Sequence, residues 1–176
     1  DNIEEKITGL DGIMVGPGFG ERGIEGKIIA AKYARESKIP FFGIGLGMQM
    51  AIVEYAQNVM NLKDANSTEM DPNAKNPIIH ISEGRKDDSQ MGSSMLLGSW
   101  NCNLKEGSLA KKIYNKDSIK ERHRHRYEFN IEYKDALEAA GMQISGFNPE
   151  RELVEIVEIP EHPWFIGVQF HPEFKS

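Results

Sequence analysis

The sequence lacks most of the features that mark secreted, membrane-spanning or nucleic-acid-binding proteins. One cysteine among 176 residues means that no disulfide can form within the chain, and a reducing, cytoplasmic setting is the simplest expectation. No apolar run approaches the roughly 18 residues of a membrane span, and no signal peptide is visible. Positive charge is also scarce, since the formal net charge is −6. Nucleic acid is therefore disfavoured as a partner, because binding it usually needs a basic face.

What is present fits a single domain of ordinary size. Hydrophobic residues make up 39% of the chain, which is enough for a sizeable core. We find no internal repeat and no low-complexity tract. The first residue is Asp1 rather than methionine, which favours a piece of a longer chain.

The first half of the sequence alternates short apolar runs with helical patterns. Strands are predicted over 10–15 and 40–44, and helices with apolar residues at helical spacing over 24–35 and 46–60. This order predicts parallel strands joined by crossover helices.

The second half adds strands, some of them antiparallel. It opens with a polar stretch, and residues 82–94 read as a mobile surface loop. Further strands are predicted over 95–102, 142–147, 153–159 and 165–170, with a hairpin turn at 148–151 and short helices over 108–114 and 133–140.

The sharpest motif is the turn between the second strand and the second helix, where residues 42–49 read Phe-Gly-Ile-Gly-Leu-Gly-Met-Gln. In hydrolases with such an elbow, the residue at its apex carries the nucleophile. The first N–H groups of the following helix suit a thiolate or an oxyanion. Here the apex is Gly45, which has no side chain. The alternative interpretation is that these glycines only permit close packing of helix on sheet.

A second candidate lies near the end of the chain, where His171 follows the last predicted strand. A histidine at a strand end can act as a general base near neutral pH. Glu173, two residues later, can orient the ring and fix its tautomer. The alternative is a surface histidine that has an acidic neighbour by chance.

Five segments together resemble the glutaminase domain of the class I glutamine amidotransferase family, and within it the CTP synthase family. The resemblance runs from about Leu10 to Ser176. It implies a flavodoxin-like α/β fold with a mostly parallel central sheet, helices on both faces and added antiparallel strands, and with the domain's first strands missing from this chain. The five segments are residues 43–49, 61–69, the Glu-Arg-His-Arg-His-Arg stretch at 121–126, 162–165 and 170–174.

The resemblance implies roles for particular residues. Gly45 stands at the nucleophile position, and His171 and Glu173 match the base and its orienting acid. A carboxylate suits the α-ammonium of glutamine, and an arginine suits its α-carboxylate. The positions that match glutamine binding are Gly18, Leu46, Gly47, Met48, Gln49, Glu69 and Arg126.

The oxyanion donors implied by the resemblance are the backbone N–H of Leu46 and one from residues 16–20. The family usually reads Pro-Gly-Gly-Phe-Gly in that loop, whereas this chain reads Gly-Pro-Gly-Phe-Gly. Because Pro17 has no N–H, Gly18 is the expected donor.

The resemblance also implies a reaction, which is hydrolysis of L-glutamine to glutamate and ammonia. In the family, the ammonia passes to a synthetase domain that aminates UTP to CTP with ATP and Mg²⁺. That domain is absent from residues 1–176, so no cofactor or metal is expected here. The implied partners are L-glutamine and the synthetase domain, in a homo-oligomer when full-length.

Gly45 leaves the activity open. A substituted cysteine, a chemically modified cysteine and a natural loss are all compatible with it, and the chain as written predicts no glutaminase activity. A non-catalytic module that holds glutamine or regulates a partner is the second hypothesis. A γ-glutamyl hydrolase is a third, which the 121–126 motif disfavours.

Other chemistry-bearing residues have simpler interpretations. Cys102 lacks a glycine elbow and is expected to be a buried or surface thiol. His123 and His125 alternate along a strand, but no further ligands at metal-site spacing complete a zinc site. Arg122 and Arg124 are expected on a solvated or domain-facing surface.

Overall fold

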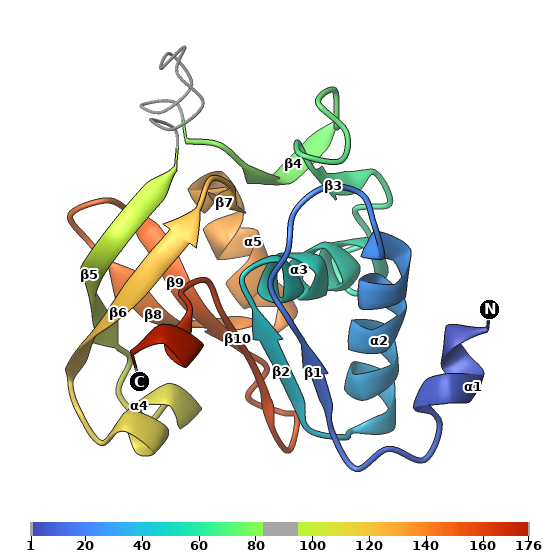
Figure 1. The fold of residues 1–176 in the computed structure, drawn as a ribbon, viewed down its shortest axis with the longest axis horizontal. Helices are drawn as coiled ribbons and strands as arrows, with labels where there is room; N and C mark the ends of the chain where they lie inside the picture. Colours follow the sequence, from blue (N-terminus) through green and yellow to red (C-terminus); the bar gives the residue numbers. More distant parts are fainter. Residues whose placement is uncertain (1, 83–94, 176) are drawn as a thin grey trace.

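A curved seven-stranded sheet runs through the molecule, with helices on both of its faces (Figure 1). The computed structural model describes residues 2–82 and 95–175. The loop expected over 82–94 lies almost wholly outside the described residues. The strand order is β1-β2-β10-β9-β8-β5-β6. The strands are β1 (Ile13–Val15), β2 (Phe41–Ile44), β5 (Leu96–Leu104), β6 (Ser118–His125), β8 (Gln143–Asn148), β9 (Leu153–Glu158) and β10 (Phe165–Val168).

The α/β class is confirmed, and the sheet is mixed. Strand β2 pairs in parallel with β1 and with β10, as the first half of the sequence predicts. The pairs β10–β9, β9–β8, β8–β5 and β5–β6 are antiparallel. The expectation of a mostly parallel sheet therefore holds only for β1, β2 and β10.

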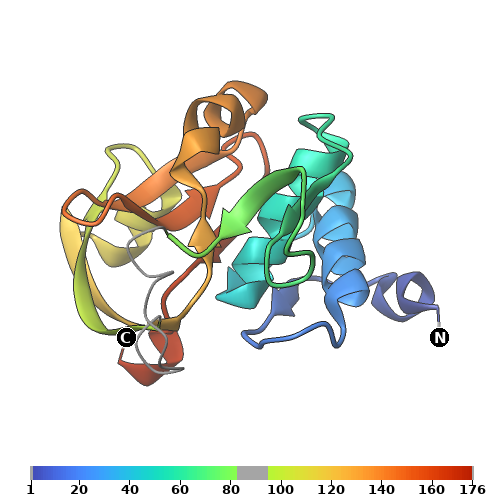
Figure 2. The same ribbon diagram turned by 90° about the horizontal axis from the view of Figure 1, so that it is seen from above.

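The helices divide between the two faces. The expected helices are present with shifted ends, and one that the sequence analysis did not predict, α1, precedes them. Figure 2 shows the layer of α2 and α3 toward one end of the molecule and the antiparallel β5–β6 pair at the other. The helices are α1 (Ile3–Ile7), α2 (Ile24–Ser37), α3 (Leu46–Asn58), α4 (Leu109–Tyr114) and α5 (Lys134–Ala140).

Two apolar clusters form the core, one on each face of the sheet. Successive residues of a strand point to opposite faces, so in β10 Phe165 joins the cluster under α2 and α3, whereas Ile166 joins the cluster under α4. In β9, Val157 and Ile156 divide in the same way. Strands buried on both faces read as continuous apolar runs, which is why their sequence signal is strong.

A small second sheet lies beside α3. Its strands are β3 (Ala65–Ser67), β4 (Asn76–His80) and β7 (Glu128–Phe129), in that order. Strand β3 pairs in parallel with β4, and β4 pairs antiparallel with β7. This sheet brings the segment after β3, which contains Glu69, toward the segment between β6 and β7, which contains Arg126.

A buried ion pair joins α2 to α3. The Glu54 carboxylate is fully buried and accepts hydrogen bonds from Arg35 Nε at 3.0 Å and from an Arg35 terminal nitrogen at 2.6 Å. The Asn58 amide donates a further bond to Glu54 at 3.1 Å. The hydrogen bonds of Arg35 to Glu54 and the negative charge of that carboxylate raise the pKa of Arg35 above its ordinary value, although burial opposes the rise. Within the described residues, no helix is long and apolar enough to cross a membrane.

Two glycines of the strand–helix turn are required by packing. An ideal Cβ on Gly43 would lie 2.8 Å from the Met48 backbone nitrogen, and one on Gly47 would lie 2.0 Å from the Val15 carbonyl oxygen. Helix α3 can therefore lie this close to β1 and β2 only because these two residues have no side chains.

We expect Gly47→Ala to lower the free energy of unfolding by about 2–3 kcal/mol, because the added methyl group forces α3 away from β1. Urea denaturation measures this change. Gly16→Ala is the matched control, since its Cβ would have no neighbour within 4 Å among the described residues; its effect should stay within about 0.5 kcal/mol. Equal losses for the two variants would contradict the packing requirement.

Candidate active site

Gly45 lies at the apex of the turn between β2 and α3. Its φ of 55° and ψ of −111° are a backbone conformation that side-chain-bearing residues rarely adopt. Its N–H donates to the Val168 carbonyl at 2.8 Å, and its carbonyl accepts from the Gln49 N–H at 3.1 Å. The turn is therefore fixed to the end of β10 on one side and begins α3 on the other.

Packing explains the neighbouring glycines but not Gly45. An ideal Cβ on Gly45 would have as its nearest neighbour the Pro17 Cβ at 3.4 Å, an ordinary contact distance. A Cβ at this position would therefore meet no clash, and it would face Pro17 in the 16–20 loop. The strand–helix turn thus combines two packing glycines with one open apex.

The 16–20 loop is held at both ends. The Lys27 ammonium donates to the Gly16 carbonyl at 3.0 Å, and burial lowers the pKa of Lys27. The Gly20 N–H donates to Glu69 Oε1 at 2.9 Å. Between these ties, an ideal Cβ on Gly18 would lie 3.5 Å from the Leu46 side chain. The loop therefore covers the start of α3.

The start of α3 offers N–H groups to a ligand. The first backbone bond of the helix runs from Gln49 to Gly45, so the N–H groups of Leu46, Gly47 and Met48 have no acceptor within the helix. The Met48 side chain is fully buried in the core. Only the backbone of Met48 can therefore contact a ligand.

His171 and Glu173 follow β10 and form a close pair. His171 Nδ1 and Glu173 Oε1 are 2.6 Å apart, and the ring stacks on Phe174 with centroids 4.9 Å apart. The His171 N–H donates to the Arg122 carbonyl at 2.8 Å, which fixes the backbone. Because Val168 pairs with Ile44 in the parallel β10–β2 ladder, Gly45 and His171 follow neighbouring strand ends at one edge of the sheet.

Gln49 has an internal role in this structure. Its side chain is buried, and its Nε2 donates to the Tyr127 carbonyl at 3.0 Å and to Gln169 Oε1 at 3.1 Å. It therefore ties α3 to the segment after β6 and to the segment after β10. The place of Gln49 in the motif at 43–49 had suggested only glutamine binding.

The charges of Glu69 and Arg126 both act on the hydroxyl of Tyr127. Burial raises the pKa of the Tyr127 hydroxyl, the Glu69 carboxylate raises it further, and the Arg126 guanidinium lowers it. Strand β6 ends at His125, so Arg126 lies just past the strand, whereas Arg122 and Arg124 are exposed on it. One acid and one base thus lie near the same ring.

The remaining candidates have structural roles. Cys102 is fully buried, as one of its two interpretations expected, and burial raises the pKa of its thiol, which does not suit a nucleophile. His162 Nε2 contacts the Ala34 carbonyl at 2.9 Å, and its Nδ1 accepts from the Trp164 N–H. No group of three or more potential metal ligands occurs in the described ranges 2–82 and 95–175.

A family model described as glutamine amidotransferase class-I matches residues 1–176. The chain belongs to the class-I glutamine amidotransferase family. Among curated relatives, the CTP synthase of Christiangramia forsetii is 58% identical over 174 residues, covering 99% of this chain and 32% of the relative. The CTP synthase of Flavobacterium johnsoniae is 55% identical over 176 residues, covering 100% of this chain and 33% of the relative. The chain thus spans a third or slightly less of these two proteins.

A solved structure agrees with this assignment. The Trypanosoma brucei CTPS glutaminase domain with bound acivicin superposes on this amidotransferase chain with a TM-score of 0.92 and 42% identity. The match covers 98% of this chain and 67% of that one. The resemblance and the fold class predicted from the five segments are therefore confirmed.

Three contributors to this candidate site were not predicted from the sequence. Lys27 holds the 16–20 loop, Gln169 anchors Gln49, and the charges of Glu69 and Arg126 both act on the pKa of Tyr127. Gln169 and Tyr127 directly flank segments already singled out, so their positions offered a signal. Lys27 lies on a helix like many other lysines, and its sequence neighbourhood offers none.

Proposed function

We propose that the chain is the glutaminase domain of a CTP synthase, built to hydrolyse L-glutamine to glutamate and ammonia. As written, it binds glutamine without hydrolysing it, because Gly45 supplies no nucleophile. The observation that carries this proposal is the apex itself, which has a strained backbone, room for a Cβ, and the His171–Glu173 pair on the neighbouring strand end.

Each residue of the site would have a distinct role in glutamine hydrolysis. A thiolate at position 45 would attack the amide carbon of the substrate, and backbone N–H groups of Leu46 and Gly18 would stabilise the oxyanion. His171, oriented by Glu173, would protonate the leaving ammonia and then activate water. Without the thiolate, the sequence of steps cannot begin.

Glutamine itself would be held through its two α-groups. Glu69 Oε1 holds the Gly20 N–H, and its carboxylate suits the α-ammonium. Arg126 suits the α-carboxylate, which a guanidinium can bind through two parallel hydrogen bonds. The shared neighbour Tyr127 supports placing both groups around one ligand.

The released ammonia would serve a synthetase domain that lies outside these 176 residues and aminates UTP with ATP and Mg²⁺. That domain is the proposed partner, within a homo-oligomer of full-length chains. The second candidate function is a non-catalytic glutamine-binding or regulatory module, which Gly45 itself favours.

Titration calorimetry and ammonia release together test the proposal. We expect the chain to bind L-glutamine and to release no ammonia above background. Arg126→Met should weaken binding about tenfold or more, because a hydrogen-bonded charge pair contributes about 1.5–3 kcal/mol. Arg124→Met is the matched control, since this exposed neighbour on β6 should leave binding unchanged. Clear ammonia release from the unaltered chain, or equal binding by both variants, would overturn the assignment.

A further inference from the structure

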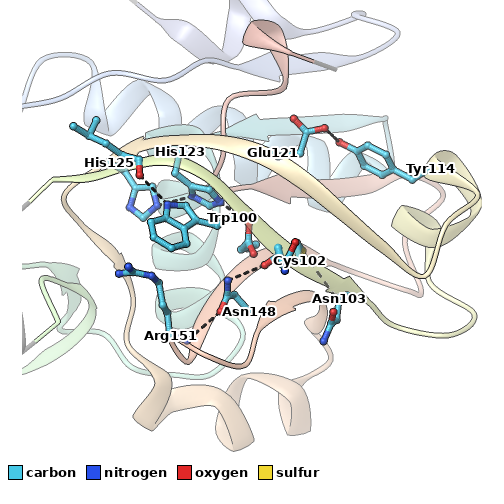
Figure 3. Close-up of polar contacts among 12 residues, drawn as sticks. Trp100, Cys102, Asn103, Tyr114, Glu121, His123, His125, Asn148 and Arg151 are labelled. Atoms are coloured by element: carbon cyan, nitrogen blue, oxygen red, sulfur yellow. Dashed lines mark hydrogen bonds and ion pairs between the residues drawn. The ribbon is translucent and has the colours of Figure 1, made fainter.

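A row of buried polar side chains crosses the sheet beside the candidate site, and no step of the proposed reaction uses it. Glu155 on β9 and His123 on β6 are fully buried, and His125 is nearly so. His123 Nε2 lies 2.5 Å from Glu155 Oε1, and His123 Nδ1 lies 2.8 Å from His125 Nε2. Figure 3 shows the contact between the two imidazole rings. The row ends where His125 Nδ1 meets the Tyr127 carbonyl at 3.0 Å.

The Tyr127 carbonyl at the end of the row determines which nitrogen of His125 carries a proton. A carbonyl oxygen only accepts, so His125 Nδ1 must carry a proton. Three hydrogen bonds then need three protons, which is one more than a carboxylate and two neutral imidazoles supply. The additional proton belongs to Glu155, His123 or His125.

Burial decides which group holds this proton. Separating charge between a carboxylate and an imidazolium in a buried site costs more than keeping both groups neutral. Burial also raises the pKa of Glu155, and the Glu121 carboxylate adds to that rise, while His123 and the Cys102 thiol oppose it. A neutral Glu155 then donates to His123, His123 donates through Nδ1 to His125, and His125 donates through Nδ1 to Tyr127.

The end of this row lies next to the proposed ligand. The Tyr127 carbonyl accepts from His125 and also from Gln49 on α3, so the backbone directly after Arg126 is held from two sides. Strand β6 ends at His125, and the ladder no longer supports the chain beyond it. The two hydrogen bonds replace that support.

We propose that Glu155, His123 and His125 are positioning residues, which form a proton-ordered row that starts at a neutral Glu155 and holds the Tyr127 carbonyl in place. By holding this carbonyl, the three residues also position Arg126 to bind the α-carboxylate of glutamine. This second part rests on the proposed function, whereas the proton order does not.

Nitrogen-15 NMR of histidine-labelled protein tests the proton order directly. We expect both His123 and His125 to carry their proton on Nδ1 at neutral pH, with Nε2 unprotonated. His123→Asn and His125→Asn assign the two sets of resonances. A proton on His125 Nε2, or an imidazolium at either ring, would overturn the proposed order.

Two substitutions at Glu155 test the effect on the ligand. The Glu155→Gln amide can donate to His123 Nε2 as a neutral acid does, so this variant should keep both tautomers and bind glutamine as the unaltered chain does. Glu155→Leu cannot donate, and its glutamine Kd should rise about five- to tenfold, the change expected for one misplaced hydrogen-bonding group. Equal glutamine affinity in the two variants would overturn the positioning role.

The two levels of the inference fail separately. If the unaltered chain shows the expected tautomers but binds no glutamine, then the proposed function and the role of the row in it are wrong, and the proton order stands. If Glu155→Leu does not fold, the comparison of Glu155→Gln with the unaltered chain still tests the proton order. A tautomer change or weaker glutamine binding in Glu155→Gln would show that the row needs a charged carboxylate.

Discussion

Replacing Gly45 by cysteine is expected to turn a glutamine-binding chain into a glutamine hydrolase. The added Cβ would face Pro17, whose own Cβ lies 3.4 Å from the ideal position. It would lie at the N-terminus of α3, whose N–H groups and dipole favour a thiolate. Loss of a nucleophile from a catalytic triad can lower kcat by a factor on the order of 10⁶, so the gain should span several orders of magnitude. Ammonia release from glutamine measures it.

The matched control is Gly45→Ala, which adds the same Cβ without a nucleophile. Both variants must adopt a φ of 55°, so each should lose about 1–3 kcal/mol of folding free energy. Only Gly45→Cys should gain activity, and His171→Asn added to it should remove most of that gain. A folded Gly45→Cys that releases no ammonia would count against the nucleophile position.

Breaking the buried pair between α2 and α3 is expected to give the largest loss of stability. Arg35→Met removes the partner of a fully buried carboxylate at Glu54. Leaving a buried charge uncompensated costs about 3–5 kcal/mol, of which the bond from Asn58 offsets only a part. Urea denaturation monitored by circular dichroism gives the difference.

The double variant Arg35→Met with Glu54→Leu is the control for this loss. It replaces both charged groups by apolar ones, and such replacements are often neutral or stabilising. We expect it to recover most of the stability that the single variant loses. A double variant as unstable as Arg35→Met would show that the packing of the Arg35 stem, and not the unpaired charge, causes the loss.

Much of the fold was predictable because it is encoded locally. The buried runs of β2 and β10 and the glycines before α3 each carry their signal within a few residues. Only part of the antiparallel pairing was predictable in this way. The antiparallel pairing of β8 with β9 agrees with the hairpin turn predicted at 148–151. The pairing of β8 with β5 joins segments far apart in the sequence, such as Asn103 and Phe147, and no local pattern reveals it.

In the candidate site, too, contacts between residues close in the sequence were predictable, and contacts between distant residues were not. The pairing of His171 with Glu173 spans two residues and was visible in the sequence. The contact of His123 with Glu155 spans 32 residues and joins two strands, so the alternation in β6 showed the histidines without their acid. Met48 was assigned to ligand binding by its place in a motif, and its core position follows only from the packing of α3 against Gly167.

The bond between Glu69 and the Gly20 N–H has a thermodynamic consequence. If the same carboxylate also receives the ammonium of glutamine, the ligand and the 16–20 loop share one acceptor. Their equilibria are then linked, and the linkage is reciprocal. Any change that displaces the loop, such as loss of the Lys27 bond to Gly16, should alter glutamine affinity at a distance, and bound glutamine should alter the freedom of the loop by the same free energy.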